Sequence, residues 1–230
     1  AATLTQKEEA FATTFFTKGK YNPFGVSQRA YVGFLNSVRS RVFYSYAEKW
    51  GDMATPEQYK ALGTFINAAS GRGNLGPLER AAPVVAQAFF SPRFFMSRIR
   101  LPASLVADNP LRAGPSVSRV AARNIATTMG IYVGLLSMLK VSGLADLNLD
   151  PRSADFGKAR FGNTRVDFFA GYLQLARYTA MMMTGQGAFG IPSQRGDTLV
   201  RFLRSKLAPI PGAAGHIRYG RAFAGAELRW

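Results

Sequence analysis

Four aspartates lie between residues 146 and 167, and their carboxylates are the groups in this chain best suited to chemistry. Paired acids at a suitable distance serve glycosidic hydrolysis or bind a metal ion. Basic residues are interleaved with these acids, and opposite charges at such spacings favour ion pairs around a hairpin. We therefore predict a structural ion-pair network made of Asp150, Arg152, Asp155, Lys158, Arg165 and Asp167. A lytic enzyme that uses the clustered aspartates stays open as an alternative.

Other catalytic groups are scarce. The chain has no cysteine, which excludes a disulfide framework, a zinc ribbon and a thiol nucleophile. It has one histidine, which excludes zinc or iron sites that need two histidines. That residue, His216, lies in a glycine- and arginine-rich segment, a poor place for an oriented base. We predict a protein that is not an enzyme and that has no metal and no cofactor.

Two glycine-rich runs match the pattern G-x-G-x-x-G, at residues 71–76 and 185–190. A dinucleotide-binding loop needs a strand before it and a helix that opens inside it. Both runs follow predicted helices instead. Glycine at a helix end allows the left-handed conformation that closes the helix, so we interpret both runs as helix ends.

The charge of the chain is strongly positive. Its 29 Lys and Arg against 13 Asp and Glu give a net charge of +16, which favours anionic partners. The excess is concentrated in residues 91–123 and 195–230, where aromatic residues are interleaved with the arginines. This pattern predicts contact with nucleic acid or with an acidic protein, a solvated basic face being the alternative. The candidate contact residues are Arg93, Arg98, Arg100, Arg119, Arg123, Arg201, Arg204, Lys206, Arg218 and Arg221.

These groups must be positioned mainly by helices. Hydrophobic residues make up 47% of the chain, too large a share for disorder. A turn is expected at 22–25, and Ser27 and Asp197 are expected to cap helices. Apolar spacings of three and four, with caps and prolines, predict the helices 5–18, 27–50, 56–70, 78–90, 92–101, 116–142, 168–184 and 197–203. Two short strands around Gly162-Asn163 predict a hairpin.

The predicted fold is mainly α, an irregular multi-helix domain with one small β-hairpin element. An N-terminal helical part is expected at 1–102 and a connector at 103–115. A second helical part is expected at 116–230, with the hairpin near 145–167 and a basic tail. The connector contains an Asn-Pro turn, and it either separates two helical halves or merely joins two helices.

One predicted helix raises a membrane question. Asn124–Leu139 contains 16 uncharged residues, whereas a spanning helix needs about 20 apolar ones. The segment includes Asn124, Thr127 and Thr128, so a core helix is the favoured interpretation. Insertion into a membrane after a conformational change stays open.

Several motifs, taken in order, resemble a known family. The run Asp150–Lys158, continued by Gly162–Asp167, resembles the C-terminal region of very large phage and prophage proteins, often called large polyvalent proteins. Residues 29–36, 66–73 and 90–94 fit the same region in the same order, and the similarity covers roughly residues 25–210. The resemblance implies a virion-associated, multi-domain chain whose enzymatic modules lie elsewhere. It assigns no catalytic residue to this region.

We therefore expect a non-enzymatic structural module of a phage virion. It would be part of a large internal or ejection protein that is delivered with the genome, packed against other virion subunits in an oligomeric assembly and against DNA. The expected location is the virion, and the host envelope or cytoplasm after ejection. The alternative is a membrane-active, channel-forming ejection component that inserts Phe11–Phe16 and Asn124–Leu139.

Overall fold

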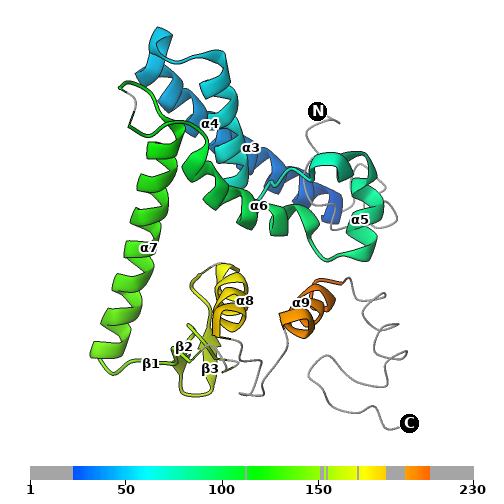
Figure 1. Ribbon diagram of the computed structural model, residues 1–230, viewed down its shortest axis with the longest axis vertical. Helices are drawn as coiled ribbons and strands as arrows, with labels where there is room; N and C mark the ends of the chain where they lie inside the picture. Colours follow the sequence, from blue (N-terminus) through cyan, green and yellow to red (C-terminus); the bar gives the residue numbers. More distant parts are fainter. Residues whose placement is uncertain are drawn as a thin grey trace. The chain divides into compact units, whose positions relative to one another are not determined.

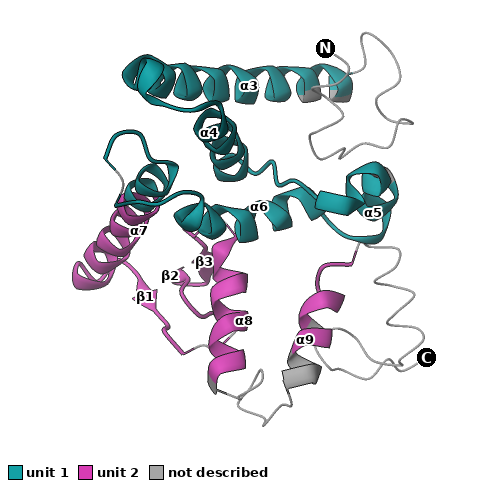
Figure 2. Ribbon diagram, turned by 45° about the horizontal axis from the view of Figure 1, so that its top comes forward, with its two compact units in different colours: residues 1–124 teal, residues 125–230 magenta. Residues whose placement is uncertain are grey.

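The computed structural model describes residues 23–111, 113–150, 153, 155–169, 171–184 and 195–207. These residues form helices and one small three-stranded antiparallel sheet (Figure 1), which confirms the mainly α fold with a small β element. The helix predicted at 5–18 and the basic tail lie outside the described residues. The chain divides into two compact units, residues 1–124 and 125–230 (Figure 2), and each has its own apolar core.

The first unit is helical. Its boundary with the second unit lies inside the continuous helix α7. The described residues of the connector expected at 103–115 form the end of α6, η3 and part of the loop into α7. The elements of the first unit are α3 (Pro23–Trp50), η1 (Gly51–Met53), α4 (Pro56–Ala69), η2 (Gly76–Ala81), α5 (Ala82–Ala88), α6 (Pro92–Ala103), η3 (Ser104–Val106) and the start of α7 (Val117–Val141).

The start of α4 follows its local sequence. The Thr55 hydroxyl accepts a hydrogen bond from the Gln58 amide at 3.3 Å, and the Gln58 side chain accepts one from the Thr55 amide at 2.9 Å. This capping box satisfies two amides that the helix leaves unpaired, and Pro56 occupies a position that needs no amide hydrogen. Gly71 follows the end of the helix with a φ of +86°, as predicted from the sequence.

Two of the predicted helices differ from the structure at a proline. The turn predicted at 22–25 and the cap predicted at Ser27 are wrong, because Pro23 already begins α3. Proline is favoured in the first helical turn, where its missing amide hydrogen costs nothing. The helix predicted at 78–90 is divided into η2 and α5, since Pro83 has no amide hydrogen with which to continue the ladder.

A third proline displaced a helix end. Pro102 was predicted to stop α6, but the helix continues to Ala103. The loss is limited to the hydrogen bond of Pro102 itself, because the amide of Ser104 still donates to the carbonyl of Arg100.

The core of the first unit lies where the end of α3, α4 and the start of α7 meet. Leu62, Val117 and Ala121 have no exposed surface. Trp50 packs beside Tyr59 with ring centroids 6.1 Å apart. The buried members of this core are Trp50, Leu62, Phe65, Ile66, Val117 and Ala121.

The second unit contains the small sheet. After α7 come β1 (Asp146–Leu147), β2 (Ala159–Phe161), β3 (Thr164–Val166), α8 (Tyr172–Thr184) and α9 (Arg195–Arg204). The predicted hairpin is confirmed, with Phe161 opposite Thr164. Gly162 has a φ of +57° at the first central position of the turn, where a type II′ turn needs glycine. The cap predicted at Asp197 is wrong, because α9 begins two residues earlier, at Arg195.

The second core joins α7 to the sheet. Leu136, Ala145 and Ala159 are buried there, and the rings of Tyr132 and Phe169 meet edge to face at 5.6 Å. Farther along the chain, α8 and α9 pack together, and Tyr178 stacks on Phe202 with centroids 4.4 Å apart. The contacts of Leu136 and Tyr132 determine which face of α7 is covered within the second unit.

Candidate functional site

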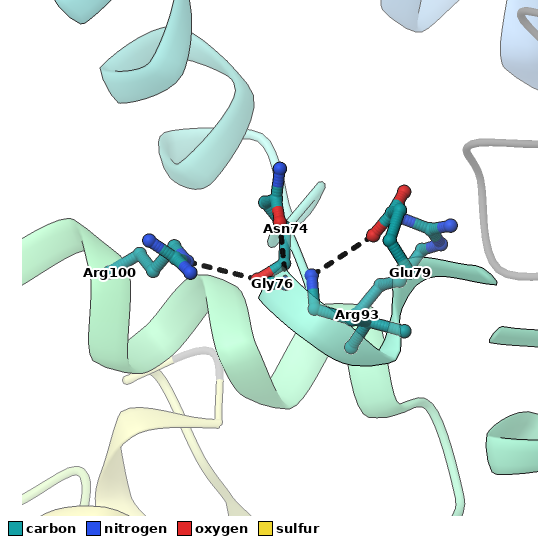
Figure 3. Close-up of polar contacts among 6 residues, drawn as sticks. Asn74, Gly76, Glu79, Arg93 and Arg100 are labelled. Carbon is teal, nitrogen blue, oxygen red and sulfur yellow. Dashed lines mark hydrogen bonds and ion pairs between the residues drawn. The ribbon is translucent and has the colours of Figure 1, made fainter. Parts of the chain in front are cut away.

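The first basic group does not form one continuous exposed surface. Arg93 was predicted to contact an anionic partner, but its side chain is only 7% exposed and its guanidinium pairs with Glu79 at 2.8 Å (Figure 3). A buried guanidinium that is neutralised inside the fold is not free to meet a phosphate. Arg93 therefore has a structural role, and the correction reflects a partner 14 residues away in the sequence.

Two further arginines of α6 are partly occupied. The guanidinium of Arg98 lies 4.1 Å from the ring centre of Phe94, a cation–π geometry. Arg100 donates from Nε to the carbonyl of Asn74 at 2.9 Å (Figure 3). Both residues are half-buried, and Arg100 holds the loop that precedes η2.

That loop is the first G-x-G-x-x-G run, and its amides are already used. The amide of Gly73 donates to the carbonyl of Arg93 at 3.0 Å, and that of Leu75 donates to the Glu79 carboxylate at 3.1 Å. The amide of Gly76 donates to Asn74 Oδ1 at 2.6 Å (Figure 3). A phosphate-binding loop needs amides that point outward, so this run is a packed helix end. The second run, at 185–190, lies outside the described residues.

Arg119 and Arg123 are the most accessible members of the first group. They lie one turn apart near the start of α7, and both are exposed. The Arg119 guanidinium donates to the carbonyl of Gly114. Neither has a carboxylate partner in the ion pairs found among the described residues, so this pair retains its charge for an anionic partner.

The second basic group is described only in part. Arg201 lies in α9, and Arg204, in the same helix, is half-buried. Lys206 donates to the Gln174 side chain and lies 5.1 Å from the ring centre of Phe202. Burial lowers the pKa of the Lys206 ammonium. Arg218 and Arg221 lie outside the described residues.

Of the predicted ion-pair network, the structure shows the pair of Asp155 with Arg165. The Asp155 carboxylate accepts a hydrogen bond from Arg165 Nε at 2.7 Å. This bond lowers the pKa of Asp155, with smaller contributions from the charges of Lys158 and Arg160. Arg152 lies outside the part of the chain that the structure describes.

Two other acids of the prediction take part in local bonds. The Asp167 carboxylate accepts the amide of Phe169 at 2.8 Å, and the backbone amide of Asp150 donates to Asn148 Oδ1 at 2.8 Å. A cavity of about 310 Å³ lies beside the sheet, and both acidic and basic side chains line it. Its lining residues are Asp146, Leu147, Asn148, Leu149, Asp155, Lys158 and Arg160. Among the described residues, no group of three His, Cys, Asp or Glu side chains is placed to hold a metal ion.

Asp108 is a structural acid that the sequence analysis missed. One carboxylate oxygen accepts the amide of Val117 at 2.8 Å, and the other accepts the Ser118 amide at 2.9 Å and the Ser116 hydroxyl at 2.8 Å. The Ser118 hydroxyl also bonds to the Asp108 backbone. The cap lies nine residues before the helix begins, beyond the spacing of any local capping motif.

Burial alone would raise the pKa of Asp108, but the hydrogen bonds to its carboxylate outweigh this effect. The amides of Ser118 and Val117 contribute most, followed by the hydroxyls of Ser116 and Ser118. The net result is a lowered pKa, so the ionised form is the one that caps α7.

The apolar stripe predicted on the helix 27–50 has two different environments. Its C-terminal half packs into the core through Phe43, Tyr46 and Trp50. A second set of apolar side chains, on a neighbouring face of the same helix, is exposed at spacings of three and four residues. The exposed members are Tyr31, Phe34, Val38 and Val42, with exposures of 57%, 66%, 41% and 39%.

Helix α7 also exposes apolar side chains. By length and composition it can cross a membrane, and little of its apolar stretch is buried. The core-helix interpretation therefore holds for one face only, the face that packs on the sheet through Leu136.

Comparison of the chain with models of protein families, with curated proteins and with solved structures found no match.

Proposed function

We propose that this chain is a non-enzymatic structural module of a phage virion, part of a large internal or ejection protein that is delivered with the genome. The ordered motifs that resemble large polyvalent proteins support the virion assignment. The net charge of +16 supports a position close to DNA or to an acidic subunit.

The observation that carries the proposal is the exposed apolar face of α3. Four large apolar side chains, from Tyr31 to Val42, lie on one helix face in water. Contiguous apolar surface on a soluble chain marks an interaction site. The occupant we propose is a helix of a neighbouring virion subunit, because a stripe with spacings of three and four matches the ridges of a packed helix.

The acids near the hairpin support a structural role over the lytic alternative. A glycosidase needs one carboxylate held protonated and a second placed across the scissile bond. Asp155 is instead held ionised by Arg165, and Asp167 caps the amide of Phe169. Both side chains stabilise the loop conformations around the sheet.

A photocrosslinking amino acid at Phe34 tests this function in particles of the phage or prophage that encodes the chain. We expect mass spectrometry of purified particles to find the polypeptide, and the Phe34 probe to crosslink to another virion protein. The matched control places the probe at Thr64, which is exposed on α4 outside the stripe, and should give little crosslinking. Particles that lack the polypeptide would overturn the proposal.

Binding to DNA should depend steeply on salt. Each phosphate contact releases counterions, so the affinity for duplex DNA should fall by orders of magnitude between about 50 and 200 mM salt. Replacing Arg119 and Arg123 with glutamine should reduce the logarithmic salt slope by about 2. Fluorescence anisotropy with a labelled duplex measures this slope.

The control for the DNA measurement removes the same charge elsewhere. Arg41→Gln with Lys60→Gln changes two exposed cations on α3 and α4, outside both basic groups, and should leave the slope nearly unchanged. An affinity that stays flat from low to high salt would contradict a phosphate contact.

A further inference from the structure

Helix α7 has two faces of different character. Residues of one face are buried or half-buried at spacings of four and three: Ile125, Met129, Tyr132, Leu136 and Leu139. Leu136 and Leu139 of this face pack in the core that contains the sheet. The opposite face repeats the same spacing in solvent through Thr127, Ile131, Gly134, Met138 and Val141. Ile131 and Met138 are each 63% exposed and Val141 is 88% exposed. We call this second set the outer face of α7.

The charges of α7 itself all have one sign. Its residues Val117–Val141 contain the cations Arg119, Arg123 and Lys140 and no Asp or Glu. All three are exposed; Arg123 lies one turn before Thr127 on the outer face, whereas Lys140 lies one turn after Leu136, on the side of the inner face. An apolar face with a cation at its start complements a surface that is apolar inside and anionic at its edge, which is the interface of a bilayer with anionic lipids.

The packing of the inner face decides how α7 meets such a surface. Leu136 is buried, and Tyr132 packs on Phe169. A spanning orientation would break this core, whereas a helix that lies in the plane of the interface leaves it intact.

We propose that α7 docks on anionic phospholipid bilayers through its outer face. The helix lies parallel to the membrane, with Ile131, Met138 and Val141 in the acyl boundary and Arg123 among the phosphates. The proposal rests on α7 alone and does not depend on the virion assignment.

The absence of cysteine from the chain allows a direct test. Met138→Cys, labelled with the environment-sensitive dye NBD, should shift its emission to the blue on vesicles of phosphatidylcholine and phosphatidylglycerol. It should not respond to phosphatidylcholine alone. The control label, at Val106→Cys, lies on η3 at a position with 82% exposure and should not respond to either vesicle.

Flotation with the same vesicles measures the contributions of the two kinds of contact. Ile131→Ser and Met138→Ser should each weaken binding about tenfold, because each removes an apolar side chain from the acyl boundary. Arg123→Gln should weaken it about fivefold, and only on anionic vesicles. The matched control, Val106→Ser with Leu111→Ser, changes side chains with 82% and 92% exposure and should bind as the parent chain does.

Each other outcome overturns the proposal. Binding that is absent at low salt, or a control label that responds as strongly as the label at position 138, contradicts docking through the outer face. A blue shift that appears without vesicles and grows with protein concentration identifies a second copy of the chain as the occupant. The substituted side chains are exposed, so an unchanged circular dichroism spectrum separates lost binding from lost folding.

Discussion

Gly73→Ala is expected to destabilise the first unit by about 3 kcal/mol, at the upper end of the usual cost of overpacking. A methyl group at Gly73 would lie 2.3 Å from the amide nitrogen of Ser97 and 2.4 Å from the carbonyl oxygen of Arg93. These are backbone atoms of α6, so no side-chain rotation relieves the clash. Urea unfolding followed by circular dichroism measures the change.

Gly63→Ala is the matched control for this variant. Gly63 lies inside α4, and a methyl group there would meet no atom within 4 Å. Alanine is the better helix former by about 1 kcal/mol, so this change should be neutral or stabilising. Equal effects of the two substitutions would contradict the close packing of Gly73 against α6.

Asp108→Ala is expected to cost about 3 kcal/mol. The change removes the cap of α7, which is worth about 1 kcal/mol, and it leaves the buried hydroxyl of Ser116 and the amides of Val117 and Ser118 without their carboxylate partner. Because Val117 is fully buried, the first unit cannot expose these groups to water without losing part of its core. Thermal and urea unfolding measure the loss.

The neighbouring Asn109 provides the control. Its side chain accepts one exposed hydrogen bond, from the amide of Leu111 at 3.0 Å. Asn109→Ala should therefore cost about 1 kcal/mol or less. A similar cost at both positions would show that the Asp108 hydrogen bonds contribute no more than an ordinary turn contact.

The Asp108 carboxylate makes the stability of the first unit depend on pH. The pKa of Asp108 is lower in the folded chain than its ordinary value of 3.8, so the folded state favours the ionised form. Its contribution is fully present above that ordinary value and is lost as the pH falls through the folded pKa. Unfolding is measured downward from about pH 6, which lies above both pKa values. The free energy of unfolding should decline less in Asp108→Ala than in the parent chain.

Local chemistry was enough to predict several elements. Thr55 and Pro56 signal the start of α4, because a cap acts on amides two and three residues away. Gly162 signals the hairpin turn, since glycine, which has no Cβ atom, adopts a positive φ without strain. Where two local signals competed, as at Pro23 and Ser27, the sequence did not show which of them begins the helix.

The role of a single residue depended more on its neighbours in the tertiary structure than on the sequence pattern around it. Arg93 belongs to a basic group in the sequence, yet Glu79 neutralises it inside the fold. Gly73 matches a phosphate-loop pattern, yet its role is to let α6 approach the backbone. In both cases the deciding neighbour is many residues away, and a local pattern carries no information about it.

The helical character, the net charge of +16 and the pairing of the hairpin depend on composition and short-range geometry, so the sequence was sufficient for them. Packing determined which parts of the apolar stripes are covered. Phe43 and Trp50 of α3 meet α4, whereas Phe34 stays in water, and α7 buries Leu136 but exposes Met138. Side chains with the same hydrophobicity and spacing differ only in whether another element lies against them, and that depends on how distant segments meet in space.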